Sequence, residues 1–228
     1  MKKIICLLAF IFTPLVINAQ SDDYTERPSI GFNTGPTFSN IRGNDAAEKN
    51  SYAFNFMAGI SFEHPVSRQF SVLANVNYER KTFKQDIRFE NPNNFDPIVN
   101  DPAFLTGEIT LKGTFHYITV PVDIRYYIGE SKKVFINAGP FASVFIDDTY
   151  TVDGDKTTEG DGEANFKRMD FGVNLGLGTK FAITQTQALS VELRHNYGLG
   201  DISDMKEISN DKVKTNSFNL IVNWSFQL

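Results

Sequence analysis

The chain has 228 residues, 27 of them acidic and 22 basic, and a formal net charge of −5. This acidic balance argues against a nucleic-acid-binding protein, because such proteins present clustered lysine and arginine to the phosphates. The length suits a single domain, and no Pro/Ser linker, low-complexity tract or run of like charge divides it. Outside the N-terminus there is no helical period and no apolar stretch of about 18 residues, so we predict no membrane-spanning helix.

The N-terminus has the pattern of a secretory signal peptide. Lys2 and Lys3 precede an apolar run over residues 4–12, which is too short to cross a bilayer as a helix. We predict cleavage after Ala19, which removes two lysines and Cys6, the single cysteine. The mature chain then carries a formal charge of −7 and no thiol, so disulfides, thiolate metal sites and cysteine catalysis are excluded.

Alternation of apolar with small or polar residues dominates the mature chain. A β-strand produces this pattern, because its successive side chains point to opposite faces of the sheet. We expect residues 20–28 to form an N-terminal periplasmic segment and residues 29–228 to form one β-barrel domain. In chain order, seven strands have a consistent apolar face, made of Ile30, Phe32 and Phe38; Phe54, Phe56, Ala58, Ile60 and Phe62; Phe70, Val72, Ala74, Val76 and Tyr78; Ile118, Val120, Val122, Ile124, Tyr126 and Ile128; Phe171, Val173, Leu175, Leu177 and Phe181; Leu189, Val191, Leu193 and Tyr197; and Phe218, Leu220, Val222, Trp224, Phe226 and Leu228.

The fifth of eight strands, over residues 134–146, is less regular than the others. Phe135, Phe141 and Phe145 occupy one face, while Val134 and other aliphatic residues occupy the opposite face. Both faces are therefore apolar in part. Parity alone leaves the register of this strand open.

The connections between strands alternate in length. Three are short, near residues 64–68, 129–132 and 184–187. Four are long, near residues 40–51, 84–114, 147–165 and 200–215. Short and long connections therefore lie on opposite rims, which is typical of an eight-stranded antiparallel transmembrane β-barrel with short periplasmic turns and long extracellular loops.

The polar face of the strands distinguishes a membrane barrel from a soluble barrel that holds a ligand inside. A soluble barrel would cover its outside with Lys and Glu, whereas this face is mostly Gly, Asn and Ser, which suit a narrow lumen filled by side chains. Five charged residues share this parity, and we expect them to form salt bridges in the lumen, because unpaired buried charges are costly. They are Glu79, Asp123, Arg125, Glu192 and Arg194.

Aromatic residues on the apolar face gather near the strand ends and predict two interfacial girdles. The periplasmic girdle would contain Phe62, Phe70, Tyr126, Phe181, Trp224 and Phe226. The outer girdle would contain Phe54, Tyr78, Phe171, Tyr197 and Phe218. We therefore expect outer-membrane lipid and lipopolysaccharide to surround the barrel, whose closure satisfies the backbone hydrogen bonds inside lipid.

Short motifs recur in a fixed order along the chain. They are Gly31-Phe32-Asn33-Thr34-Gly35, Ala58-Gly59-Ile60, Val120-Pro121-Val122, Ala138-Gly139-Pro140-Phe141, Asp170-Phe171-Gly172, Gly176-Leu177-Gly178 and Tyr197-Gly198-Leu199. With this order the sequence resembles the PorT-like outer-membrane β-barrel family over most of the mature chain. The resemblance implies an outer-membrane barrel and, for certain members, a role in protein secretion with an envelope or secretion protein as partner.

The C-terminus also looks like the signal that the barrel-assembly machinery reads during biogenesis. Trp224, Phe226 and Leu228 carry the resemblance. That signal more often ends in an aromatic residue, and here it ends in leucine.

The sequence offers little catalytic or metal-binding chemistry. His64, His116 and His195 lack the spacing of a metal site. His195 has the lipid-facing parity near the outer rim, where a lipid-modifying barrel enzyme would place a histidine with a serine and an acid; an interfacial, aromatic-like role is the simpler interpretation. The loop over residues 147–163 holds seven Asp and Glu residues that could bind Ca²⁺, although a solvated acidic loop is favoured. We expect no cofactor, no metal and no enzymatic activity.

Three hypotheses for function follow. The first is a non-enzymatic barrel that serves as a structural, adhesive or binding protein through its extracellular loops, with the longest loop, 84–114, as the main candidate. It should not be a wide pore, because eight strands leave an interior filled by side chains. The second is a membrane component of a protein secretion assembly, and the third is a lipid-modifying barrel enzyme.

Overall fold

The computed structural model describes residues 27–89, 107–152, 155–159, 166–204 and 212–228. The predicted leader, most of the 20–28 segment and the middle of the 84–114 loop lie outside the described residues. Ten elements are described: β1 (Ser29–Arg42), α2 (Asp45–Glu48), β2 (Ser51–Pro65), β3 (Phe70–Phe89), β4 (Gly107–Ile128), β5 (Val134–Val152), β6 (Asp155–Glu159), β7 (Met169–Ala182), β8 (Gln187–Gly198) and β9 (Lys214–Gln227).

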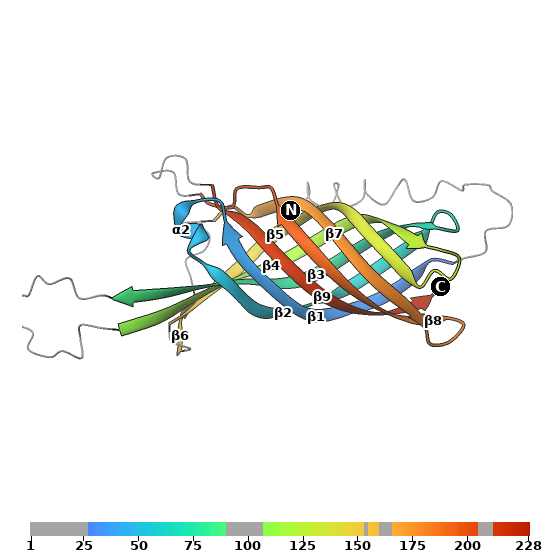
Figure 1. Ribbon diagram of the computed structural model, residues 1–228, viewed down its shortest axis with the longest axis horizontal. Coiled ribbons are helices and arrows are strands. Elements are labelled where there is room, and N and C mark those ends of the chain that lie inside the picture. Colours follow the sequence, from blue (N-terminus) through green and yellow to red (C-terminus); the bar gives the residue numbers. More distant parts are fainter. Residues whose placement is uncertain (1–26, 90–106, 153–154, 160–165, 205–211) are drawn as a thin grey trace, which may run out of the picture.

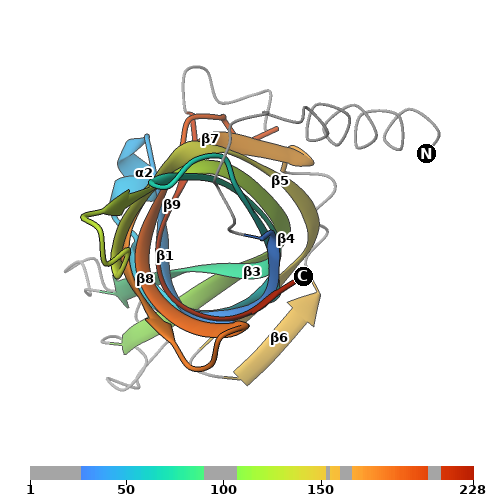
Figure 2. The ribbon, with the colours of Figure 1, turned by 90° about the vertical axis from the view of Figure 1, so that its right-hand side faces the viewer.

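Eight of these strands form a closed antiparallel ring, as Figure 2 shows end on. In the ring, each strand pairs with the next strand along the chain, except that β5 pairs with β7. The short strand β6, which lies between them in the sequence, is not part of the ring. The ring closes between the first and last strands, from Ser29↔Gln227 to Arg42↔Lys214. The predicted eight-stranded antiparallel barrel is confirmed. No helix in the described part of the chain is long and apolar enough to cross a membrane.

The two faces of each strand differ as the alternation predicts. In β1, Phe32 is 62% exposed on the outside of the ring, whereas its neighbour Asn33 is 5% exposed and faces the lumen. The other strands repeat this inside-out pattern, with large apolar side chains outward and Asn, Ser, Thr and charged residues buried. An apolar exterior of this kind needs lipid around it, because soluble monomers rarely expose such large apolar areas.

The open register of β5 is settled by the glycines of β7. Phe135 and Phe141 point into the lumen and are at most 3% exposed, while Val134 and its even-numbered neighbours face outward. Phe135 lies over Gly178 and Phe141 over Gly172, where a Cβ atom would collide with each ring. Small residues on β7 thus leave room for large residues on β5, which is how a narrow barrel fills its interior.

Several strands are longer than the predicted ones. On the rim of the long connections, β3 and β4 run well past the other strands (Figure 1), and their pairing continues to Phe89↔Gly107. The short strand β6 pairs with the end of β5 within the predicted 147–165 loop. A one-turn helix, α2, lies in the predicted 40–51 connection. The Asn44 side chain caps its N-terminus by accepting a hydrogen bond from the Ala47 N–H.

Candidate functional site

Two arginines and three carboxylates form a connected ion-pair network across the lumen. Arg194 contacts Glu192 through Nε at 2.7 Å and Asp123 through Nη2 at 3.3 Å. Arg125 contacts Glu63 at 2.9 Å and Glu192 at 3.5 Å. Every one of these side chains is buried. The network therefore ties β2, β4 and β8 together through the inside of the barrel.

Glu79 lies apart from this network, although it was predicted to take part in a lumenal salt bridge. Its carboxylate accepts hydrogen bonds from Asn219 Nδ2 at 2.9 Å, Ser217 Oγ at 3.0 Å and Thr119 Oγ1 at 2.9 Å. Neutral donors thus stabilise its buried oxygens, since hydrogen bonds to a charged acceptor are stronger than neutral ones. The other four predicted charges meet one another in the network.

A second ion pair lies farther toward the outer rim. Lys81 Nζ is 3.1 Å from Asp170 Oδ2, and both side chains are almost completely buried. Asp170 also accepts a hydrogen bond from Thr215 Oγ1 at 2.6 Å. The Lys81 ammonium lies 4.9 Å from the centre of the Tyr117 ring, a cation–π distance. This pair joins β3 and β7 and lies directly below an apolar layer.

Buried apolar side chains close the outer end of the lumen. We call this layer the outer plug; it consists of Phe83, Phe115, Tyr117, Phe145 and Ile202. Ile202 comes from the connection between β8 and β9, and backbone hydrogen bonds to Lys167 and Val213 hold it in place. The described part of the β8–β9 connection next to β8, residues 199–204, therefore folds inward at Ile202 over the barrel mouth.

An ion pair outside the membrane-spanning strands fixes this connection. Asp201 accepts hydrogen bonds from Lys167 Nζ at 2.5 Å, the Val213 N–H at 3.0 Å and the Ser203 N–H at 3.2 Å. Burial raises the pKa of the Asp201 carboxyl, but these three hydrogen bonds outweigh it and hold the pKa below its usual range. Asp201 therefore stays charged at neutral pH and anchors the outer plug.

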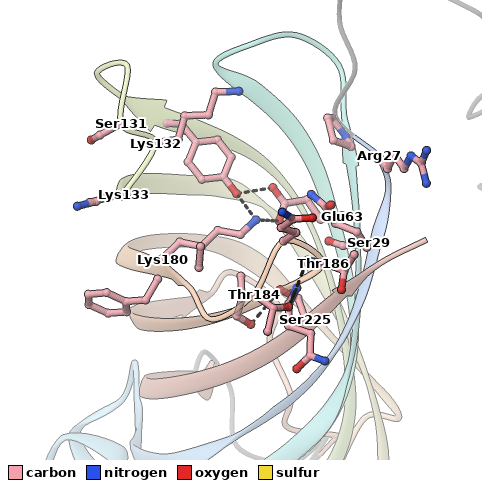
Figure 3. A pocket seen from close by; sticks show the side chains of 18 residues that line it. Arg27, Ser29, Glu63, Ser131, Lys132, Lys133, Lys180, Thr184, Thr186 and Ser225 are labelled. Carbon is pink, nitrogen blue, oxygen red and sulfur yellow. Dashed lines mark hydrogen bonds and ion pairs between the residues drawn. The ribbon is translucent and has the colours of Figure 1, made fainter.

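The periplasmic end of the lumen, in contrast, opens into a cavity of about 430 Å³ (Figure 3). At its floor, Glu63 accepts hydrogen bonds from Tyr127 Oη at 2.6 Å and from Lys180 Nζ at 3.4 Å. Arg27, Lys132 and Lys133 also line it. Among the lining residues of this cavity there are four cations and one carboxylate, so its wall is basic although the chain is acidic.

Five lumenal residues of these layers were not among the residues predicted to interact in the lumen. They are Glu63, Lys81, Tyr127, Asp170 and Lys180. Each lies at a position of its strand that alternates with the apolar residues, on the small and polar face. The alternation of the sequence therefore indicated that these side chains face the lumen. The lumenal charges are therefore more numerous than the five that were predicted.

The predicted girdle residues lie on the outer surface of the barrel, and several are in contact. Near the periplasmic end, the rings of Phe70 and Tyr126 are 5.0 Å apart, and those of Trp224 and Phe226 are 5.2 Å apart. The remaining predicted girdle residues also lie on lipid-facing positions of their strands, namely Phe54, Phe62, Tyr78, Phe171, Phe181, Tyr197 and Phe218. Trp224 and Phe226 lie on the closing seam opposite β1, and Leu228 follows them.

The histidines contact aromatic rings on the outer surface. His195 stacks on Phe218 with ring centres 4.3 Å apart, and its Nε2 is 2.7 Å from Asn216 Oδ1. His116 is hydrogen-bonded to the hydroxyl of Tyr78, and His64 stacks on Phe62. The structure thus surrounds His195 with an amide and aromatic rings, an interfacial environment.

The predicted acidic loop is described only in part. Asp147 and Asp148 belong to β5, and the Asp147 side chain accepts a hydrogen bond from the Asp148 N–H at 2.8 Å. The other acidic side chains of this loop lie outside the described residues. Within the side chains that are described, no three His, Cys, Asp or Glu residues gather as metal ligands. Calcium binding by the full loop stays a prediction.

The closed ring, its apolar exterior and its polar, filled interior define an integral outer-membrane barrel. The family model of the outer membrane protein beta-barrel domain matches residues 18–204, which is more than half of the chain. The chain therefore belongs to this family, and the outer membrane is its location. The comparisons support the barrel family without confirming the narrower PorT-like resemblance.

Several solved barrels are similar in fold. Neisserial surface protein A is 15% identical, with 87% of this chain and 97% of that chain covered and a TM-score of 0.45. The outer membrane protein W of E. coli is 11% identical, with 90% and 100% covered and a TM-score of 0.44. Ail, the attachment invasion locus protein of Yersinia pestis, is 12% identical, with 89% and 100% covered and a TM-score of 0.39. No curated protein matches the chain.

Proposed function

We propose that the protein is a non-conducting, non-enzymatic barrel that acts at the cell surface, as a structural, adhesive or binding protein, through the part that projects beyond the membrane. The observation that carries this proposal is the filled lumen. Proceeding outward from the periplasmic cavity, a solute meets the ion-pair network, then Glu79 and its donors, then the Lys81–Asp170 pair, and finally the outer plug.

The projecting part supplies the surface for such a role. The β3–β4 hairpin continues its pairing beyond the ring, and β5 follows it as far as Leu111↔Val152. These strands extend the barrel wall beyond the ring, at the rim of the long connections (Figure 1). Loops on a rigid scaffold are the usual place for binding residues.

Single-channel recording in planar bilayers tests the closed lumen. The purified full-length barrel should give no stable conductance steps, because side chains occupy the path and the outer plug excludes water. The matched comparison is a variant with Phe115→Ala and Phe145→Ala, which removes two rings of the outer plug and should raise leakage without creating a wide pore. Large, stable conductance of the unmodified protein would contradict the proposal.

A membrane component of a secretion assembly, as in the PorT-like resemblance, is the second candidate. The basic cavity at the periplasmic mouth favours it, because a partner in the periplasm meets this end of the barrel. Cross-linking from Lys133, which is exposed on the periplasmic turn, would test it. A stable complex with an envelope protein, abolished by Lys132→Glu and Lys133→Glu, would favour this candidate over the first.

We also propose that export involves removal of the N-terminal leader. Lys2, Lys3 and the apolar run over residues 4–12 support this, followed by Ala19 at a suitable cleavage position. The mature protein isolated from outer membranes should begin at Gln20, as measured by intact-mass spectrometry. Retention of the first residues in the membrane form would contradict it.

A further inference from the structure

The positive charge of the periplasmic cavity lies mainly at its mouth. The floor of the cavity joins the ion-pair network of the lumen, in which three cations balance three carboxylates. These are Arg125, Arg194 and Lys180 with Glu63, Asp123 and Glu192. The lining contains three further cations, Arg27, Lys132 and Lys133. We call these three residues the rim cations, and they account for the basic character of the cavity.

The rim cations lie on opposite sides of the opening (Figure 3). Arg27 precedes β1, whereas Lys132 and Lys133 precede β5, the strand opposite β1 in the ring of eight. Arg27 and Lys133 are exposed, and neither takes part in a salt bridge within the described part of the chain. Glu130 belongs to the same turn as Lys132 but does not line the cavity. An anionic partner that crosses the mouth would therefore meet cations at both sides.

The seven residues that precede Arg27 form an acidic segment. Their sequence is Gln20-Ser21-Asp22-Asp23-Tyr24-Thr25-Glu26, with three carboxylates and no lysine or arginine. These residues lie outside the described part of the chain. Removal of the leader after Ala19 would add a single ammonium group, so the segment stays acidic. Its carboxylates equal the rim cations in number.

The chain leaves the barrel wall directly at this mouth. The Pro28 carbonyl accepts a hydrogen bond from the Leu228 N–H at 2.9 Å, and Ser29 lines the cavity. Seven extended residues reach at most about 25 Å, which lets the acidic segment pass from β1 towards β5 across the opening. Covalent attachment at the rim also gives the segment a high effective concentration there.

We propose that residues 20–26 bind across the mouth of the periplasmic cavity, with their carboxylates paired to the rim cations. Charge complementarity and the attachment point favour this segment over a soluble anion or a second copy of the chain. The proposal depends on the geometry of the cavity and on neither function proposed above. A periplasmic partner that binds the same cations would first have to displace the segment.

Disulfide trapping in the full chain tests this placement. Ser21→Cys supplies a thiol on the acidic segment, and Thr186→Cys supplies one on the cavity lining. In the matched control, Gln69→Cys replaces Thr186→Cys. Gln69 precedes β3 and Thr186 precedes β8, so each position is separated from β1 by one strand of the ring, but Gln69 does not line the cavity. Every variant also carries Cys6→Ser, which removes the leader thiol.

The disulfide between positions 21 and 186 should form about tenfold faster than the one between positions 21 and 69, because several exposed ion pairs together supply roughly this factor. The double variant Lys132→Gln, Lys133→Gln should remove most of this preference, and so should Asp22→Asn with Asp23→Asn. Salt at about 1 M should have the same effect, since it screens exposed charges. Mass spectrometry after mild oxidation measures each disulfide.

Further controls separate a specific site from general charge and from misfolding. Arg68→Gln removes a cation from the β2–β3 turn, outside the cavity, and should leave the preference unchanged. Heat-modified mobility on gels checks that each variant is folded. Equal rates at positions 186 and 69, or an unchanged preference after Lys132→Gln and Lys133→Gln, overturn the proposal. Disulfides that join two barrels also overturn it, because the segment would then occupy another copy.

Discussion

Replacing Arg194 with methionine is expected to lower the free energy of unfolding by about 3–5 kcal/mol. Arg194 is the cation shared by Glu192 and Asp123, and the side chains of all three residues are almost fully buried. Among the ion pairs of the described residues, its removal leaves Glu192 with Arg125 and leaves Asp123 without a paired cation. The cost arises from the uncompensated buried charge, since breaking one side of a buried pair is far more harmful than replacing the whole pair.

Urea titration in lipid vesicles measures this effect, and the single tryptophan, Trp224, reports unfolding from the lipid-facing surface. Arg68→Met on the exposed periplasmic turn is the control and should change stability by less than about 0.5 kcal/mol. Adding Glu192→Gln to Arg194→Met should restore part of the loss, because the two residues share one network. An Arg194→Met barrel as stable as its parent would mean that water solvates these carboxylates, which also contradicts a filled lumen.

The barrel could be predicted from the sequence because its physical determinants are local. Alternation fixes which side chains share a face, and the lengths of the connections fix the two rims. Hence Arg125 on β4 was predicted to share one lumen with Glu192 and Arg194 on β8, which lies far from β4 in the chain, and the three side chains do make contact. The same parity argument applies to Lys81 and Asp170, which also face the lumen and form an ion pair there.

Other features depend on three-dimensional packing that alternation does not encode. The sequence did not indicate which face of its strand Phe135 occupies, because both faces of β5 are partly apolar. The structure shows that its ring occupies the space over Gly178, inside the lumen. Ile202 lies in a connection with no periodic pattern, so its place in the outer plug could not be read from its neighbours in the sequence. Glu79 was expected in an ion pair, but the positions of neutral donors on β9 and β4 are a property of the ring's register.

The seam between β1 and β9 provides the second large effect, through the substitution Gly35→Ala. Thr34 pairs with Val222 and Thr37 pairs with Asn219, so the register of the seam is the same on both sides of Gly35 and Pro36. Gly35 and Pro36 themselves are not paired with β9. Pro36 has no N–H to donate, which explains the missing hydrogen bond there. A Cβ atom at Gly35 would overlap the carbonyl oxygen of Leu220, which is backbone and has no rotamer to change.

We expect Gly35→Ala to cost about 3 kcal/mol or more, beyond ordinary overpacking, because relief requires the closing strands to separate. Separation in lipid exposes backbone groups whose hydrogen bonds no water replaces, at several kcal/mol each. The measurement is the yield of the compact, heat-modifiable form after refolding into vesicles, followed by urea titration of what folds.

Two substitutions of similar size serve as controls for this prediction. Gly129→Ala places a methyl group where no atom lies within 4 Å, but at a φ of 73° that an L residue rarely adopts, so it should cost about 1–2 kcal/mol. Ala142→Val adds bulk on the exposed lipid face and should be almost neutral. The predicted order is therefore Gly35→Ala, then Gly129→Ala, then Ala142→Val. If Gly35→Ala lowered the free energy of unfolding by less than Gly129→Ala, the strands at the seam would not approach as closely as the register requires. Local backbone strain would then affect the stability of the barrel more than the closure of the seam does.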